Sequence, residues 1–154
     1  MGMRDGKEKY NDLTSGDNNS VVGEPKEFYD EKRDFTTLEA WLKCREVKLF
    51  FYKKILPRLP AEEKFNLALQ IRKAAVSITS NISEGYGRYH YREGIQFYRI
   101  SRGSLYELKD HLISCYDIGY IDIELKDEGE DLIEPAKRIL NGYINFVKKA
   151  LKKP

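Results

Sequence analysis

The chain has few of the residues that metal sites, disulfide frameworks and reactive thiols require. Its 154 residues include two cysteines and two histidines. Cys44 and Cys115 are not in a Cys-x-x-Cys pair, so we expect reduced, half-buried thiols of the kind found in cytoplasmic proteins. A metal site needs three or four converging ligands, and His90 and His111 have no such spacing with the cysteines. We therefore expect neither a metal nor a cofactor.

Catalytic constellations are also scarce. Cys115 and His111 are four residues apart and would be neighbours on one helix, but no third group that would orient the histidine can be identified. Gly85 and Gly87 follow a helical pattern, whereas a nucleotide-binding glycine motif follows a strand. The sequence therefore predicts a protein without enzymatic activity.

Long apolar segments are absent from the sequence. No apolar run approaches the roughly 20 residues of a membrane span, and the N-terminal residues lack the apolar stretch of a signal peptide. No segment alternates apolar and polar residues as a strand would. We expect a cytoplasmic, all-α protein with no membrane contact.

Charge is plentiful but unevenly distributed. Residues 1–34 contain 6 Lys/Arg and 9 Asp/Glu, a net of −3, whereas residues 35–154 contain 21 and 16, a net of +5. Between Lys64 and Lys109 the count is 8 basic residues against 3 acidic ones. The centre of the chain therefore carries a modest positive field, weaker than that of a DNA-packaging protein.

The composition divides the chain into a tail and one domain. Residues 1–34 are rich in Gly, Asp, Asn, Ser and Lys and cannot bury enough apolar surface to offset the entropy of ordering. We expect a disordered or extended acidic tail there and a four-helix bundle over residues 35–154. Helical patterns run from about 36 to 56, from 60 to 83, from 91 to 118, and from 123 onward. Short connections between them predict an antiparallel, up-down-up-down bundle.

Apolar residues at helical spacing identify the expected core of each helix. In the first helix they are Leu38, Trp41, Leu42, Leu49, Tyr52, Ile55 and Leu56. In the second they are Ile71, Ala74, Ala75, Ile78 and Ile82, before an expected break at Gly85. The third has a heptad of Tyr98, Ser101, Leu105, Leu108, Leu112 and Cys115, ended by Gly119. The fourth, capped by Asp122, offers Leu125, Leu132, Ile139, Tyr143, Phe146 and Ala150, with Pro135 expected to kink or restart it.

Basic and aromatic residues cluster around the junction of the second and third helices. The candidate phosphate ligands are Arg72, Lys73, Arg88, Arg92, Arg99 and Arg102. Tyr86, Tyr89 and Tyr91 are candidate platforms on which unstacked bases would stack. The alternative is a solvated helix face held by ion pairs such as Glu84 with Arg88. The charge pattern leaves both interpretations open.

Small polar residues interrupt the apolar second helix at Ser77, Ser80, Asn81 and Ser83. Small side chains let a neighbouring backbone approach, and a buried Asn81 amide would need a hydrogen-bond partner. These residues either form a groove where another protomer packs or satisfy the end of the helix before Gly85.

The stretch from Gln70 to Arg88, with Asn81, Glu84 and Gly85 in this order, resembles a known protein family, as does the block Gly103-Ser-Leu-Tyr-Glu107. The family consists of four-helix-bundle proteins encoded in intervening sequences of 23S ribosomal RNA genes. It is distantly related to the accessory variability determinant of diversity-generating retroelements. The resemblance implies a non-enzymatic homo-oligomer, pentameric in the known relatives, that binds nucleic acid, with structured RNA as the expected ligand. The alternative is a protein-interaction scaffold, such as a reverse-transcriptase accessory subunit, without direct nucleic-acid binding.

Overall fold

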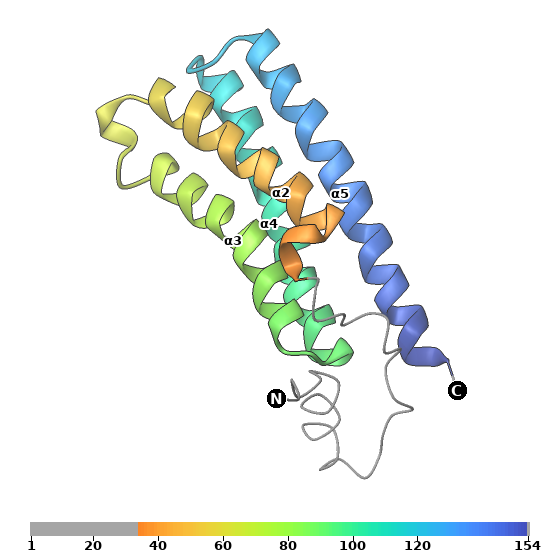
Figure 1. The fold of residues 1–154 in the computed structure, drawn as a ribbon. Helices are drawn as coiled ribbons and strands as arrows, with labels where there is room; N and C mark the ends of the chain where they lie inside the picture. Colours follow the sequence, from red (N-terminus) through yellow and green to blue (C-terminus); the bar gives the residue numbers. More distant parts are fainter. Residues whose placement is uncertain (1–33, 154) are drawn as a thin grey trace, which may run out of the picture.

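The computed structural model describes residues 34–153 and shows four long helices packed side by side (Figure 1). Helix α2 spans Glu39–Phe50, α3 spans Leu67–Gly87, α4 spans Tyr91–Ile118 and α5 spans Ile123–Lys152. Short 3₁₀ turns occupy Phe35–Thr37, Leu56–Arg58 and Ala61–Glu63, and a π-helical turn, Phe51–Ile55, follows α2 directly. No strand occurs between residues 34 and 153, and the predicted all-α four-helix bundle is confirmed. The predicted tail lies outside the described residues, except for Asp34.

Contacts between α4 and α5 establish how these two helices run. Arg102 of α4 meets Asn141 of α5, and Tyr98 meets Tyr143 with ring centroids 4.9 Å apart. The lower residue number on α4 is paired with the higher residue number on α5. The two helices therefore run in opposite directions (Figure 1). As a consequence, the N-terminal half of α4 lies beside the C-terminal half of α5.

The first helix departs from its predicted core. Leu42 and Tyr52, expected inside, are 40% and 39% exposed, so this part of the prediction was wrong. The buried residues of this segment are Ala40, Cys44, Val47, Phe50, Phe51 and Ile55. Two adjacent phenylalanines both face the core because the π-helical turn that begins at Phe51 takes up an extra residue and rotates the buried face.

The remaining helices follow their predicted pattern more closely. All the expected core residues of α3 and of the α4 heptad are buried. Gly119 ends α4 with a φ of +90°, and Asp122 caps α5 by accepting a hydrogen bond from the backbone N–H of Leu125 at 2.9 Å. Helix α5 runs through Pro135 without restarting. Phe146 was expected in its core but is 53% exposed.

Helices α3 and α4 approach each other closely at Gly85. A break in the helix was predicted at Gly85, but α3 continues to Gly87. A Cβ atom on Gly85 would lie 2.8 Å from Phe97 Cβ and 2.8 Å from Tyr98 Cε1, closer than carbon atoms pack. A hydrogen at this position is therefore what lets the two helices meet.

A polar cluster joins the same two helices further along. The hydroxyl oxygens of Ser77 and Ser104 are 2.7 Å apart, and Asn81 Nδ2 donates to the Ser77 carbonyl at 3.0 Å. Ser101 Oγ donates to the Ile78 carbonyl at 2.6 Å. Ser77 thus bonds across the two helices of one chain, and Asn81 finds the partner that its amide requires within α3.

Candidate nucleic-acid interface

The predicted phosphate ligands do not share one face of the bundle. Arg72 lies two helical turns before Thr79, whose hydroxyl accepts a hydrogen bond from Lys48 Nζ of α2 at 3.0 Å. Arg72 is therefore on the α2 side of α3. Arg102, in contrast, donates from Nη1 to Oδ1 of Asn141 on α5 at 3.0 Å. The two ends of the predicted set therefore face different neighbours, α2 for Arg72 and α5 for Arg102.

A row of other side chains separates Lys73 from the α4 arginines. Lys73 is exposed on α3. On α4, Glu93, Ile100 and Glu107 are exposed and recur every seven residues on the side of Ser104, the residue that contacts α3. Carboxylates in this row would repel a phosphate backbone laid across α3 and α4.

Arg88 is engaged close to its own helix. Its Nη2 lies 3.2 Å from Glu84 Oε1, the ion pair anticipated as the alternative to phosphate binding. Its guanidinium also lies over the Phe97 ring, 5.4 Å from the centroid. The pair is about half exposed and therefore weak, but it partly cancels the charge that Arg88 would offer to a phosphate.

Two of the three predicted stacking platforms are not at the surface. Tyr86 and Tyr91 are 4% and 1% exposed, so the prediction that they stack on bases was wrong for this arrangement. Tyr89 is 43% exposed and has a φ of +51° in the turn between α3 and α4. A left-handed φ is uncommon outside glycine, and it takes the backbone of Tyr89 out of the helical conformation. Tyr89 remains the accessible member of the three.

A larger group of cations lies where α4 meets α5. Spacings of three, four and seven residues keep side chains on one side of a helix. On α4 such spacings relate two further arginines to Arg102, and on α5 they relate Arg138, Lys148 and Lys152 to Asn141, its hydrogen-bond partner. Lys109 and Lys137 share these spacings but are paired with Glu134. We name the group the α4–α5 basic strip: Arg92, Arg99, Arg102, Arg138, Lys148 and Lys152. Arg102 and Lys148 are half-buried, and the other four are exposed.

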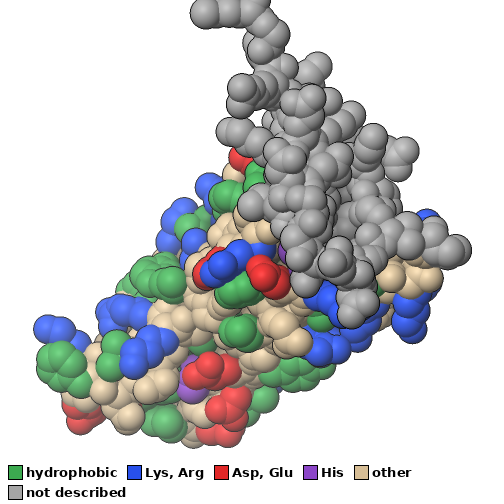
Figure 2. Space-filling model, turned by 90° about the horizontal axis from the view of Figure 1, so that it is seen from below, with side chains coloured by type: hydrophobic (Ala, Val, Ile, Leu, Met, Phe, Trp, Pro, Cys, Tyr) green, Lys and Arg blue, Asp and Glu red, His purple; other side chains and the backbone are tan. Residues whose placement is uncertain are grey.

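The strip lies toward the end of the bundle where α4 begins and α5 finishes. In the space-filling view from below, Lys and Arg side chains gather on the right, the side on which Figure 1 places the C-terminal end of α5 (Figure 2). Most of the Asp and Glu side chains visible in that view lie to their left. Other Lys and Arg side chains lie at the left of the same view, so cations occur toward both ends of the bundle.

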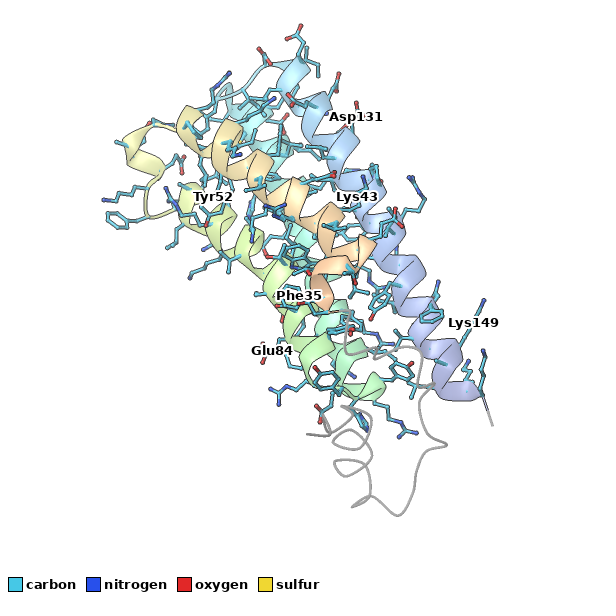
Figure 3. The ribbon with its side chains drawn as sticks, viewed as in Figure 1. Phe35, Lys43, Tyr52, Glu84, Asp131 and Lys149 are labelled. Atoms are coloured by element: carbon cyan, nitrogen blue, oxygen red, sulfur yellow. The ribbon has the colours of Figure 1, made fainter. Side chains whose placement is uncertain are left out.

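Helix α5 changes sign midway. Residues 122–134 contain 7 Asp/Glu and 1 Lys, whereas residues 135–153 contain 6 Lys/Arg and no Asp/Glu. Asp131 and Lys149 mark the two halves in Figure 3. Sequence reasoning missed the basic half of α5 because it weighed charge only around the second and third helices. The signal was nevertheless present, as a carboxylate-free segment of nineteen residues.

An ion-pair group marks the boundary between the two halves. Lys109 Nζ donates to Glu134 Oε1 at 2.7 Å, and Lys137 Nζ lies 3.3 Å from the same oxygen. The hydrogen bond from Lys109 holds the pKa of Glu134 below its ordinary value, and Glu134 raises the pKa of Lys109. Lys137 also covers the Tyr106 ring, 4.1 Å from its centroid. These charges satisfy one another and stand apart from the strip.

Comparison with known families now places the chain. The family model described as 23S rRNA-intervening sequence protein matches residues 36–142, from the start of the bundle to the middle of α5. The chain belongs to this family. No curated protein sequence matches it at the significance required. Four residues of the strip lie inside the matched range, while Lys148 and Lys152 lie beyond it.

The residues that carried the resemblance to the 23S rRNA-intervening sequence family have packing roles. Gly85 sits in the contact between α3 and α4, and Asn81 donates to Ser77, whose hydroxyl meets Ser104 of α4. Gly103, the first residue of the second block, has no such role, because it is exposed and a Cβ atom there would meet open space. The motif therefore identifies the fold rather than the surface that meets a partner.

Between residues 34 and 153 no three His, Cys, Asp or Glu side chains gather as a metal-ligand set. Within the same range no helix has the length and apolar character needed to cross a bilayer. Both cysteines are fully buried, more deeply than expected, and burial raises the pKa of Cys44 to about 12 and that of Cys115 to about 11. Their thiols therefore stay protonated at neutral pH.

Proposed function

We propose that this protein binds nucleic acid through the α4–α5 basic strip, with structured RNA as its ligand, and that it catalyses no reaction. The observation that supports this most directly is the Arg102–Asn141 hydrogen bond, because it brings the basic halves of α4 and α5 side by side. Guanidinium forks bind phosphate oxygens through paired hydrogen bonds, and lysines add point charges. Because α5 has no carboxylate after Glu134, little on that helix opposes the positive potential.

The test is fluorescence anisotropy of a labelled, structured RNA against the protein over a series of salt concentrations. Binding through the four exposed cations of the strip should weaken with salt, with a slope of log K against log salt of about −4. Absence of binding even at low salt would contradict the proposal.

Charge reversal locates the binding surface. The variant Arg92→Glu/Arg99→Glu should bind RNA at least about tenfold more weakly at low salt and show a shallower salt slope. The matched control is Lys53→Glu/Lys73→Glu, which reverses two exposed lysines outside the strip and should change affinity little. Equal losses in the two variants would show only a dependence on net charge, and would remove the strip as the site.

We further propose that the protein assembles into a homo-oligomer, with the pentamer implied by the family resemblance as the expected form. The support is apolar surface on α2 and α3: Leu42, Tyr52 and Val76 are 40%, 39% and 49% exposed. Light scattering coupled to size exclusion should give five times the 18.0 kDa mass of one chain. Leu42→Glu should lower that mass, whereas Ile100→Glu on α4 should not. A monomeric wild-type protein would contradict the assembly.

A protein-interaction scaffold is the second candidate function, and Phe65 favours it. This ring lies in the connection between α2 and α3, is 81% exposed, and has Lys64 Nζ 5.2 Å from its centroid. Exposed aromatic side chains often anchor protein interfaces. In this case a protein such as a reverse transcriptase would be captured by the wild type and lost with Phe65→Ala. RNA would then show no salt-dependent binding.

A further inference from the structure

We infer that the α4–α5 basic strip is shaped for double-helical nucleic acid, with an RNA stem as the ligand, and not for an unpaired strand. The inference rests on the proposed function and specifies its ligand. In this arrangement the cations of α4 contact the phosphates on one side of a groove, and those of α5 contact the phosphates on the other side. Three features of the strip support it.

The first feature is the arrangement of the cations in two rows. Arg92 and Arg99 lie on α4, and Arg138, Lys148 and Lys152 lie on α5. Packed helices have axes about 8–10 Å apart, so two phosphate rows that flank one groove could each lie against one row of cations. A single unpaired strand presents one phosphate row and could satisfy only one of the two.

The second feature is a pair of amides between the cations. Asn141 is half-buried and Asn145, one turn further on, is exposed. The Oδ1 atom of Asn141 accepts from Arg102 at 3.0 Å, which orients the side chain so that its amide N–H groups remain to donate. Amide donors among the cations of α5 can reach the 2′-hydroxyls and base edges of a wide, shallow RNA minor groove.

The third feature is the small amount of stacking surface along the strip. Recognition of unpaired strands depends on aromatic rings on which successive bases stack. Tyr86 and Tyr91 are buried, and the accessible Tyr89 lies in the turn before α4, outside the strip. Tyr106 is 52% exposed, but Lys137 lies over its ring, 4.1 Å from the centroid. The strip can therefore contact phosphates, but it lacks the row of accessible rings on which unpaired bases would stack.

The length of the strip sets the size of the ligand. From Arg138 to Lys152 is fourteen residues of helix, or about 21 Å at 1.5 Å per residue. That length corresponds to about six base pairs of double helix. Beyond Glu134 in the other direction α5 carries carboxylates, which would repel a longer contact.

The experiment compares three labelled probes of one sequence by anisotropy: an RNA hairpin with a stem of about twelve base pairs, the unpaired RNA strand, and the DNA duplex. The stem should bind at least about tenfold more tightly than the unpaired strand at equal salt. Shortening the stem to about three base pairs should lose most of that advantage. An unpaired strand that binds as tightly as the stem would overturn the inference while leaving the proposed function intact. If none of the probes binds at low salt, the proposed function itself fails.

The amides provide a test that does not depend on charge. Asn141→Ala/Asn145→Ala should weaken binding of the RNA stem several-fold, leave the salt slope unchanged, and affect the DNA duplex less. Asn66→Ala, which alters an exposed amide outside the strip, is the matched control. Circular dichroism and thermal unfolding verify that both variants fold. An RNA stem that binds the double variant and the wild type equally would remove the amides from the contact. In that case a retained preference for the stem over the unpaired strand would still support a double-helical ligand, held through its phosphates. If neither the amide effect nor the stem preference is observed, the inference is refuted.

Discussion

Arg102 on α4 and Asn141 on α5 are joined by a hydrogen bond from Nη1 to Oδ1 of 3.0 Å, two helical turns beyond Glu134, the last carboxylate of α5. The contact sets the relative position of two helices whose charges are unevenly distributed. From this point toward the start of α4 and the end of α5, both helices add cations to the same side of the bundle. A shift of one helix along the other would separate these charges and leave no strip.

The close contact at Gly85 leads to a stability prediction. Gly85→Ala improves helix propensity by about 1 kcal/mol, but its Cβ atom would lie 2.8 Å from Phe97 Cβ. We expect a net loss of about 1–3 kcal/mol in the free energy of unfolding, because the two helices must move apart. Gly142→Ala, also within a helix but facing open space, should instead stabilise the protein by up to about 1 kcal/mol. Urea unfolding followed by circular dichroism measures both, and equal stability of the two variants would contradict this packing.

The Lys109–Glu134 pair predicts a dependence of stability on pH. Glu134 has a pKa below its ordinary value of 4.5 in the folded protein because Lys109 donates to it. Its contribution is therefore complete above the ordinary pKa and is lost as the pH falls through the lowered folded value. The carboxylate is 46% exposed, so solvent screening limits the effect to a few tenths of a kcal/mol.

The variant Glu134→Gln tests this contribution. It should show a smaller drop in urea midpoint between about pH 7 and about pH 3 than the wild type does. Glu124→Gln, at an exposed carboxylate in the first turn of the same helix, is the control and should titrate like the wild type. If Glu134→Gln loses as much stability in acid as the wild type, the pair makes no contribution.

The two cysteines should report on unfolding. Both side chains are fully buried, and their raised pKa values keep the thiols protonated. A thiol-reactive disulfide reagent at about pH 8 should therefore label neither residue in the native protein within the time that labels urea-unfolded protein completely. Rapid labelling of native Cys44 or Cys115 would mean that the core opens readily or is packed differently.

Sequence reasoning succeeded where the spacing of the core residues is regular. Helix α4 was predicted with its observed ends because its heptad is regular and Gly119 terminates it. It failed on α2, where Leu42 and Tyr52 are bulky but face outward while Ala40 and Cys44 are small and face inward. A π-helical turn changes the periodicity locally, and hydrophobic spacing does not reveal it.

The candidate site was half predictable for a related reason. Arg92, Arg99 and Arg102 stand out as arginines on one side of a helix. Lys148 and Lys152 join them only through the register of α4 against α5, which depends on core packing and not on either helix alone. The burial of the tyrosines that flank the turn between α3 and α4 is likewise a property of the packed bundle.

The measurement that most directly tests this account is the affinity of Lys148→Glu/Lys152→Glu for an RNA hairpin, at two salt concentrations, beside the wild type and Lys53→Glu/Lys73→Glu. The two α5 lysines belong to the α4–α5 strip and not to a face over α3 and α4, so they separate the two surfaces. We predict binding at least about tenfold weaker than wild type at low salt and a slope of log K against log salt that is nearer zero by at least about one. Affinity and slope equal to those of the control variant would contradict the α4–α5 strip as the nucleic-acid interface.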